Sequence, residues 1–316
     1  MTSRSVILIG GPDSGKTNYV ARLWPSFRER RGTLRAQKLP NDIVYVDGAV
    51  EHLMQGKFAP RSDRNLEKGR QDFSIQVRGA DGTGHLTNLV VPDISGELWL
   101  NAVRSHELSE DWLNAMKTAE GAILFVRVQS EANVQPMDWV TARKLMKLHA
   151  EDGLVEAEEA HKEGDKDLAS AGSSATAELD VVVPETPELP MQVVLCELLR
   201  YLDLFLSNRH DGKPPRVAVV VAAWDLIDPG MRTGGPMAYL KREFPLFAGR
   251  LSDPRRLDLQ LFGLSIVGGD LEDDEDFKQK FFEKNLVDRG WVVVRDGAEW
   301  RQDPDVTLPI AWAVGD

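Results

Sequence analysis

Residues 10–17, GGPDSGKT, match the phosphate-loop pattern G-x-x-x-x-G-K-[ST] without a mismatch. A short apolar run over residues 6–9 precedes them, and residues 18–27 can continue as a helix. A strand that passes through a glycine-rich turn into a helix directs successive backbone N–H groups, and the positive end of the helix, toward one point. The motif therefore requires a strand, a tight turn and a helix in that order, and it predicts a site for the phosphates of a nucleoside triphosphate.

The side chains of this loop have distinct predicted roles. Lys16 is expected to reach the outer phosphates, and the Thr17 hydroxyl is expected to coordinate Mg²⁺. The other contacts are expected from main-chain groups of the loop and from the start of the helix. The residues predicted to bind nucleotide here are Gly11, Pro12, Asp13, Ser14, Gly15, Lys16, Thr17 and Asn18.

The net charge of −12 is concentrated in one segment. Residues 151–190 contain twelve acidic and two basic residues, a balance of −10, which leaves −2 for the other 276 residues. The segment is rich in Glu, Asp, Ala, Ser and Pro, so we expect a disordered surface insertion; an acidic docking arm for a basic partner is the open alternative. The near-neutral remainder argues against binding to nucleic acid.

The cysteine count and the hydrophobic pattern indicate a cytoplasmic protein. The one cysteine, Cys196, excludes a disulfide within the chain, which suits a reducing compartment. The apolar run at residues 6–9 is too short for a signal peptide. The longest apolar segment, residues 193–206, carries three charged side chains, so we predict an amphipathic helix and no membrane span.

Apolar runs alternate with helical patterns along the rest of the chain. Strands are expected at residues 5–9, 73–78, 85–92, 121–128, 217–223 and 259–267, and helices at 16–29, 97–118, 136–149, 190–208, 236–251 and 274–287. This order predicts an α/β fold with a mostly parallel sheet, one antiparallel hairpin strand and helices on both faces. We expect residues 1–316 to form a single domain, with residues 151–190 inserted and residues 291–316 packed on it as a C-terminal extension.

Polar motifs follow two further strands, at the edge of the sheet where ligands bind in such folds. After the strand that ends near residue 92 comes Asp93-Ile94-Ser95-Gly96-Glu97. Asp93 can hold Mg²⁺, usually through a water, and Gly96 can offer its N–H to the terminal phosphate. After residues 217–223 comes Asp225, whose carboxylate can accept two hydrogen bonds from guanine; adenine presents no such pair of donors.

The next strand ends in LSIVGG, residues 264–269. Backbone N–H groups at the end of this strand could reach the base oxygen. The residues assigned to this role are Ser265, Ile266 and Val267.

These motifs, in this order, resemble those of a translation-factor-related, Ras-like GTPase. GGPDSGKT matches its phosphate loop, DISG with Glu97 its second switch, AAWD its guanine motif and LSIVGG its last base loop. The opening SGKTNYV, the hairpin before Asp93 and the ending TLPIAWAV look most like bacterial double-GTPase family proteins. The resemblance implies a P-loop NTPase (Ras-like GTPase) fold, GTP/GDP and Mg²⁺ as cofactors, a protein effector or activating partner, and a role in bacterial conflict or defence systems.

The guanine motif departs from the family pattern. It normally begins Asn-Lys, whereas this chain has Ala222 and Ala223. The missing Asn would have braced the loop, and the missing Lys would have packed over the base. Trp224 is a candidate stacking face in their place, although a core position is commoner for tryptophan. Guanine selectivity then rests largely on Asp225, which leaves ATP as an alternative ligand.

The catalytic candidates are Lys16, Gly96 and Glu97. Glu97 replaces the hydrolytic glutamine of the family, and its charge would be repelled by the γ-phosphate unless it is paired. We therefore expect slow intrinsic GTP hydrolysis. Two alternatives stay open: an ATPase or phosphotransferase on the same fold, and a nucleotide-binding module that does not hydrolyse.

The first switch falls within residues 28–71. It needs a hydroxyl that closes on Mg²⁺, and Thr33 and Ser62 both qualify; we assign Ser62. Arg61 or Arg64 could supply positive charge in the transition state, with a solvated basic loop as the alternative.

Overall fold

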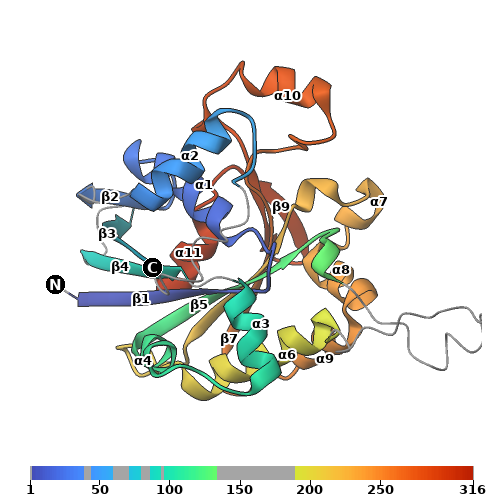
Figure 1. Ribbon diagram of the computed structural model, residues 1–316. Coiled ribbons are helices and arrows are strands. Elements are labelled where there is room, and N and C mark those ends of the chain that lie inside the picture. The colour runs from blue at the N-terminus through green and yellow to red at the C-terminus, as the bar shows by residue number, and fades with distance from the viewer. Residues whose placement is uncertain are drawn as a thin grey trace, which may run out of the picture. The chain divides into compact units, whose positions relative to one another are not determined.

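Figure 1 shows the chain as a computed structural model that describes residues 2–38, 44–59, 71–79, 86–93, 96–133 and 189–315. It divides into two compact units, residues 1–133 with 191–316 and residues 134–190, and the fold below is that of the first. Nine strands of its described residues form one sheet, in the order β2-β3-β4-β1-β5-β6-β7-β8-β9. The strands are β1 (Thr2–Ile9), β2 (Leu34–Lys38), β3 (Gln71–Gly79), β4 (Thr87–Asp93), β5 (Ala119–Arg127), β6 (Arg216–Ala222), β7 (Asp258–Ser265), β8 (Trp291–Asp296) and β9 (Glu299–Asp303).

Helices cover both faces of this sheet. The α-helices are α1 (Lys16–Arg28), α2 (Val44–Met54), α3 (Gly96–Ser105), α4 (Glu110–Thr118), α6 (Met191–Phe205), α7 (Pro229–Arg232), α8 (Gly235–Glu243), α9 (Pro245–Leu251), α10 (Glu275–Phe281) and α11 (Leu308–Val314). Helices α1, α2 and α11 lie on one side and α3, α4, α6, α8 and α9 on the other (Figure 1). None of the described helices has the length and apolar character needed to cross a membrane.

The sheet is mixed, and the prediction of a mostly parallel sheet with one antiparallel hairpin strand was wrong in this respect. Strands β4-β1-β5-β6-β7 are parallel neighbours, whereas β2-β3-β4 at one edge and β7-β8-β9 at the other are antiparallel. The second edge comes from residues 291–303, which had been assigned to the C-terminal extension. Their hairpin turns at Gly297, whose φ of 61° lies in the left-handed region that favours glycine.

The central strands are buried on both faces, which explains their continuous apolar sequences. In β5, Ile123 and Phe125 belong to the core beneath α1 and α11, and the alternating residues Ala122 and Leu124 are also fully buried. Strand β6 is buried from Val217 onward. Parallel strands covered by helices on both sides have this pattern, and their carboxyl ends meet at the edge that carries the phosphate loop.

Several helices are shorter than predicted because local signals interrupt them. The segment expected as one helix over residues 97–118 is α3 and α4, separated where His106 adopts a φ of 59° and where Ser109 caps α4 by accepting from Trp112 N–H. Pro245 divides the predicted helix 236–251 into α8 and α9. The helix predicted at residues 136–149, like most of the acidic insertion, lies outside the described residues.

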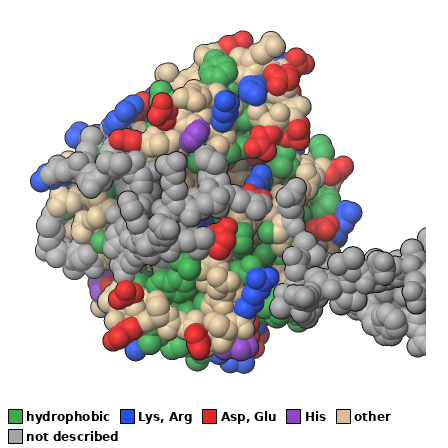
Figure 2. All heavy atoms as spheres, viewed as in Figure 1, with side chains coloured by type: hydrophobic (Ala, Val, Ile, Leu, Met, Phe, Trp, Pro, Cys, Tyr) green, Lys and Arg blue, Asp and Glu red, His purple; other side chains and the backbone are tan. Residues whose placement is uncertain are grey.

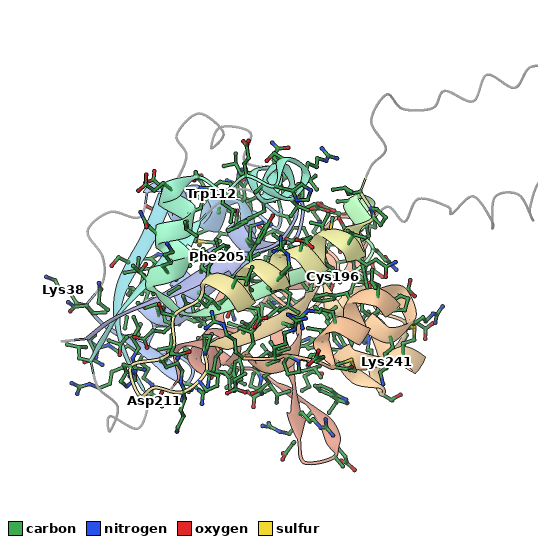
Figure 3. The ribbon with its side chains drawn as sticks, turned by 90° about the horizontal axis from the view of Figure 1, so that it is seen from below. Lys38, Trp112, Cys196, Phe205, Asp211 and Lys241 are labelled. Carbon is green, nitrogen blue, oxygen red and sulfur yellow. The ribbon has the colours of Figure 1, made fainter. Side chains whose placement is uncertain are left out.

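The helical layer formed by α3, α4 and α6 packs through aromatic side chains. The ring centroids of Trp99 on α3 and Trp112 on α4 lie 5.0 Å apart, and the Tyr201 hydroxyl on α6 donates to Ala102 O at 3.4 Å. Figure 3 shows this layer from below, with Trp112 on α4 and Phe205 on α6. Because α3 begins immediately after β4, this packing fixes the start of α3 beside the phosphate loop.

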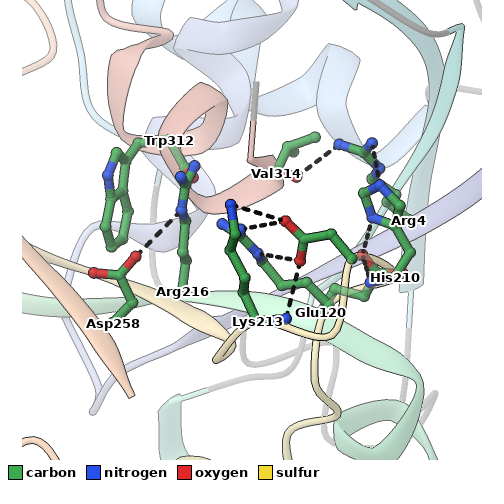
Figure 4. A network of polar contacts seen from close by, with 10 residues as sticks. Arg4, Glu120, His210, Lys213, Arg216, Asp258, Trp312 and Val314 are labelled. Atoms are coloured by element: carbon green, nitrogen blue, oxygen red, sulfur yellow. Dashed lines mark hydrogen bonds and ion pairs between the residues drawn. The ribbon is translucent and has the colours of Figure 1, made fainter. Parts of the chain in front are cut away.

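A polar network at the amino ends of the parallel strands holds α11 against the sheet (Figure 4). Arg4 on β1 donates to Val314 O at 2.9 Å, and Arg216 on β6 donates to Trp312 O at 3.0 Å. The Arg216 guanidinium also lies 5.2 Å from the Trp312 ring centroid. These arginines satisfy carbonyl groups in the last turn of α11. The network lies at the amino ends of the strands, whereas the phosphate loop lies at their carboxyl ends.

Candidate functional site

The phosphate loop connects β1 to α1. Asp13 (φ 55°) and Gly15 (φ 89°) adopt the left-handed region, which turns the chain sharply enough for α1 to begin at Lys16. Lys16 is only 6% exposed, and its ammonium donates to two carbonyl oxygens of the loop, 2.9 and 3.1 Å away, and to Ser14 Oγ at 3.1 Å. The lysine charge is therefore held within the loop, at the end of α1 that attracts anions.

The start of α3 touches this loop. A Cβ atom placed on Gly96 would clash with the carbonyl group of Gly11, so a glycine is needed where the two main chains meet. Glu97 is half-buried in the first turn of α3, and Thr17 is half-buried in the first turn of α1. Asp93 is the last residue of β4. The structure thus brings the two motifs together by their main chains at one edge of the sheet.

The residues considered for the first switch are only partly described. Ser62, Arg61 and Arg64 lie outside the described residues. The Thr33 hydroxyl donates to Asp305 Oδ2 at 2.7 Å, and the Thr33 N–H donates to the same oxygen at 2.6 Å. The Thr33 hydroxyl, one of the two candidates for the Mg²⁺ contact, is therefore hydrogen-bonded to Asp305 in this structure.

The second polar cluster follows β6. Ala223 adopts a φ of 55°, and the chain then forms a short 3-10 helix, η4 (Trp224–Leu226), that contains Asp225. Burial raises the pKa of the Asp225 carboxyl above its ordinary value of 3.8, and a hydrogen bond from Ser265 acts in the opposite direction. Ser265 is fully buried, and its Oγ accepts from Gly268 N–H at 2.9 Å. The carboxylate is therefore oriented by Ser265, the last residue of β7.

Arg232, at the end of α7, braces the main chain around Asp225. Its Nη2 donates to Asp225 O at 2.7 Å and its Nε donates to Ile227 O at 2.9 Å. Two carbonyl groups of one loop are thus fixed by one guanidinium, which is a planar group with donors in fixed directions.

Trp224, the candidate stacking face, lies in the core instead. It is fully buried, its ring centroid lies 6.2 Å from that of Tyr239, and a Cβ atom on Gly263 would lie 2.6 Å from its ring. The bulk of the indole is accommodated because β7 has a glycine beneath it. The ring therefore supports η4 from within the core, and the Trp224 side chain is not available as a stacking face.

Parts of both clusters line one pocket of about 540 Å³. The described residues Lys16, Thr17, Gly96, Glu97 and Ser265, to which the sequence assigned roles, are not among those that line it. Its walls come from the phosphate loop, α1, the segment after α2, the ends of β5 and β6, η4 and the base loop with the residues that follow it. The lining residues are Asp13, Gly15, Asn18, Phe58, Ala59, Arg127, Gln129, Ala222, Ala223, Asp225, Leu226, Leu264, Ile266, Val267, Gly269, Asp270, Glu272 and Asp273. A pocket of this size accommodates a small organic ligand. The acidic lining residues Asp270, Glu272 and Asp273 directly precede α10, and Figure 2 shows acidic side chains on the part of the surface where Figure 1 places that helix.

Sequence reasoning missed Phe58 and Arg127. Phe58 is the one aromatic side chain among the described lining residues. Its position is fixed because the next residue, Ala59, donates its N–H to Asn18 Oδ1 at 2.9 Å, and because Phe58 packs against a cluster that includes Val267 of the base loop. A lone Phe within a basic segment carries no motif, so the sequence offered no signal for it.

The described residues contain no group of three or more His, Cys, Asp or Glu side chains arranged to hold a metal ion.

Comparison with known proteins extends these observations. The sequence matches the family described as Double-GTPase 1 over residues 7–313. No curated protein matches it. Among solved structures, the S. cerevisiae Ski7 GTPase-like domain, bound to GTP, is similar at a TM-score of 0.34 and 11% identity. That match covers 89% of this chain and 49% of the other, so the chain spans about half the length of that neighbour.

Proposed function

The chain belongs to the Double-GTPase 1 family, and on that premise we propose that it binds guanine nucleotides with Mg²⁺ and hydrolyses GTP slowly, as a nucleotide-controlled switch. One observation carries the proposal: the phosphate loop, through Asp13 and Gly15, and the half-buried Asp225 line the same pocket. A loop that binds phosphates and a carboxylate that binds a base are the two ends of one nucleotide site.

At the phosphate end, the main-chain N–H groups of residues 13–16 and the Lys16 ammonium neutralise the phosphates. Mg²⁺ takes one or two protein oxygens and completes its shell with waters and phosphate oxygens. The Thr17 hydroxyl, in the first turn of α1, and the Asp93 carboxyl, at the end of β4, are oxygen donors of this kind. Bound there, Mg²⁺ would neutralise charge on the phosphates, and Gly96 N–H would donate to the γ-phosphate.

At the base end, Asp225 accepts two N–H groups of guanine. The pairing is selective, because a bound base covers this half-buried carboxylate, and with adenine the carboxylate would lose its water and gain no donors. Ala222 and Ala223 give the base no packing surface comparable to a lysine stem. Phe58 supplies a flat apolar face instead, since ring faces stack on any base. Main-chain N–H groups of Ser265, Ile266 and Val267 reach the base oxygen.

The switch would lie in residues 28–71 and 93–118, where the exchange of GTP for GDP would change the conformation and with it a surface that a protein partner reads. Glu97, in the first turn of α3, replaces a neutral water-orienting side chain with a charged one, which keeps intrinsic turnover low. An activating protein and a cytoplasmic setting in bacterial conflict or defence follow from the family resemblance.

Calorimetric titration with GDP, a GTP analogue and an ATP analogue in Mg²⁺ tests the proposal. We expect tight guanine binding that falls by about 100-fold or more in Asp225→Asn, because one hydrogen bond loses its charged acceptor and the other is replaced by two N–H donors that face each other. Asp228→Asn is the matched control, since Asp228 is exposed and caps α7 through Gly230 N–H at 2.7 Å.

Xanthosine diphosphate sharpens the same test. Xanthine has an oxygen where guanine has its exocyclic amine, and an asparagine at position 225 can donate to that oxygen. Asp225→Asn should therefore gain affinity for xanthosine diphosphate while it loses GDP. ATP binding that equals or exceeds GTP binding, and that Asp225→Asn leaves unchanged, would contradict the proposal and favour an ATPase.

A further inference from the structure

The phosphate loop carries a negative side chain that is paired with an arginine from another strand. Asp13 Oδ1 forms an ion pair with Nη1 of Arg127, the last residue of β5, and Asp13 Oδ2 accepts from Ser130 Oγ at 2.9 Å. Both partners are partly exposed, at 26% for Arg127 and 21% for Asp13, and both line the pocket that Asp225 lines. The guanidinium therefore lies at the phosphate end of the proposed nucleotide site.

A carboxylate in this position needs a positive partner. An anionic side chain beside a polyphosphate is repelled at short range. Asp13 lies within the phosphate loop, where its backbone adopts the left-handed conformation. Arg127 neutralises that charge. Since an arginine has five N–H donors, and Nη1 is its one atom with a side-chain partner among the described residues, Nε and Nη2 are left to donate to a ligand.

The arginine is also well positioned by its backbone. It pairs with Ala222 of β6 in the parallel register, and its carbonyl oxygen accepts from Asn133 Nδ2 at 2.6 Å. The guanidinium thus projects from the end of a rigid central strand and is oriented by Asp13, so little ordering is needed when a ligand binds.

We propose that Arg127 is a catalytic residue that contacts the nucleotide phosphates and stabilises the charge that develops during GTP hydrolysis. This inference rests on the proposed function. In that reaction the oxygen of a water attacks the γ-phosphorus, and the bond to the β–γ bridging oxygen breaks. The electron pair of that bond stays on GDP, and the protons of the water pass to inorganic phosphate and solvent. A guanidinium at the phosphates offsets the charge that moves onto the leaving oxygen. The positive charge that stabilises the transition state would then come from Arg127 on β5, in addition to any arginine of the switch region.

Single-turnover hydrolysis of GTP and GDP affinity, measured on the full chain in Mg²⁺, test this assignment. GTPases with an arginine in cis turn over about 30-fold faster than those without one. Arg127→Gln is therefore expected to slow hydrolysis by about that factor, with a much smaller change in GDP affinity, and Arg127→Lys to restore part of the rate. Arg295→Gln, on the exposed part of β8, is the control.

A double variant separates catalysis from simple neutralisation of Asp13. If Arg127 only cancels the charge of Asp13, then Asp13→Asn combined with Arg127→Gln recovers the wild-type rate, and our assignment is overturned. If Arg127 acts on the phosphates, the double variant stays as slow as Arg127→Gln. An unchanged rate in Arg127→Gln also overturns the assignment.

Failure of the proposed function has a different signature. A wild-type chain without guanine binding refutes that function, whatever Arg127 does. If wild type binds GTP without turnover, the ratio of GTP-analogue affinity to GDP affinity tests whether Arg127 contacts the γ-phosphate. A lower ratio in Arg127→Gln supports contact with the γ-phosphate, and an unchanged ratio overturns it.

Discussion

Arg22 joins α1 to the base loop from a buried position, and its replacement by methionine should weaken both the fold and nucleotide binding. Its side chain is 1% exposed. It donates to the carbonyl oxygens of Ile266 (3.1 Å), Val287 (3.0 Å) and Arg289 (2.5 and 3.2 Å), and to Ser26 Oγ (2.7 Å). Ile266 lines the pocket. One guanidinium thus ties the helix after the phosphate loop to the loop for which we propose contacts with the base.

The expected loss of stability follows from two opposing effects. In Arg22→Met, three main-chain carbonyl groups lose a buried donor at about 2 kcal/mol each, which amounts to about 6 kcal/mol. Removal of the buried cation offsets part of this. Burial lowers the pKa of Arg22 from 12.5 to about 10, which corresponds to a cost of about 3 kcal/mol for the charged form. The free energy of unfolding should therefore fall by about 3 kcal/mol.

Denaturation of the nucleotide-free protein by guanidinium chloride, followed by tryptophan fluorescence, measures this change. Nucleotide is left out because bound GDP adds its own stabilisation, which the variant is also expected to weaken. Arg28→Met is the control, because Arg28 is the exposed last residue of the same helix. GDP affinity of Arg22→Met, measured where the protein is folded, should fall as well. A loss of stability below about 1 kcal/mol, or one that Arg28→Met matches, would refute the reasoning.

Three further outcomes are expected. Gly96→Ala forces a methyl group into the phosphate loop and should lower the free energy of unfolding by about 1–3 kcal/mol together with GTP-analogue affinity. Gly249→Ala is the control, because its added Cβ meets nothing within 4 Å. It should lower neither the free energy of unfolding nor the GTP-analogue affinity, as thermal melts and titrations would show. Phe58→Ala should weaken binding of GDP and ADP alike by about tenfold, whereas calorimetry should show no change for the exposed Phe282→Ala. The pKa of Asp225 is raised, and base binding needs its ionised carboxylate. As the pH is lowered, the carboxylate should therefore be protonated, and GDP affinity should begin to fall, at a higher pH than for an ordinary aspartate. GDP affinity that stays level from pH 7 to 4 in folded protein contradicts this prediction.

The part of the site that the sequence predicted is the part made of contiguous residues. The phosphate loop is built from eight consecutive residues, and its strand, turn and helix are local structures that the sequence specifies directly. Asp225 was found by its place after a buried strand, because parallel strands end at a common edge. Each of these predictions needs only the local chain and the general rule for α/β sheets.

The residues that were missed depend on distant contacts. The pair of Asp13 and Arg127 spans 114 residues and forms because β5 is the direct neighbour of β1, a strand order that no local pattern encodes. The hairpin of β8 and β9 carried an Asp-Gly turn signal at Asp296, but its strands are partly polar and sit at the edge of the sheet, so an extension was an equally good interpretation.

The two alanines of the guanine motif show how a departure in sequence can be compensated in space. The asparagine missing at position 222 would have braced the loop around Asp225, and in the structure that brace comes from Arg232, seven residues along the chain from Asp225. Because Arg232 bonds to main-chain carbonyls, it holds the loop whatever side chains stand at positions 222 and 223. In the proposed site, loss of the Asn-Lys pair would therefore remove side-chain contacts to the base without loosening the Asp225 carboxylate. On this proposal, Ala222 and Ala223 would affect how tightly guanine is held, whereas the choice of guanine over adenine would depend on Asp225.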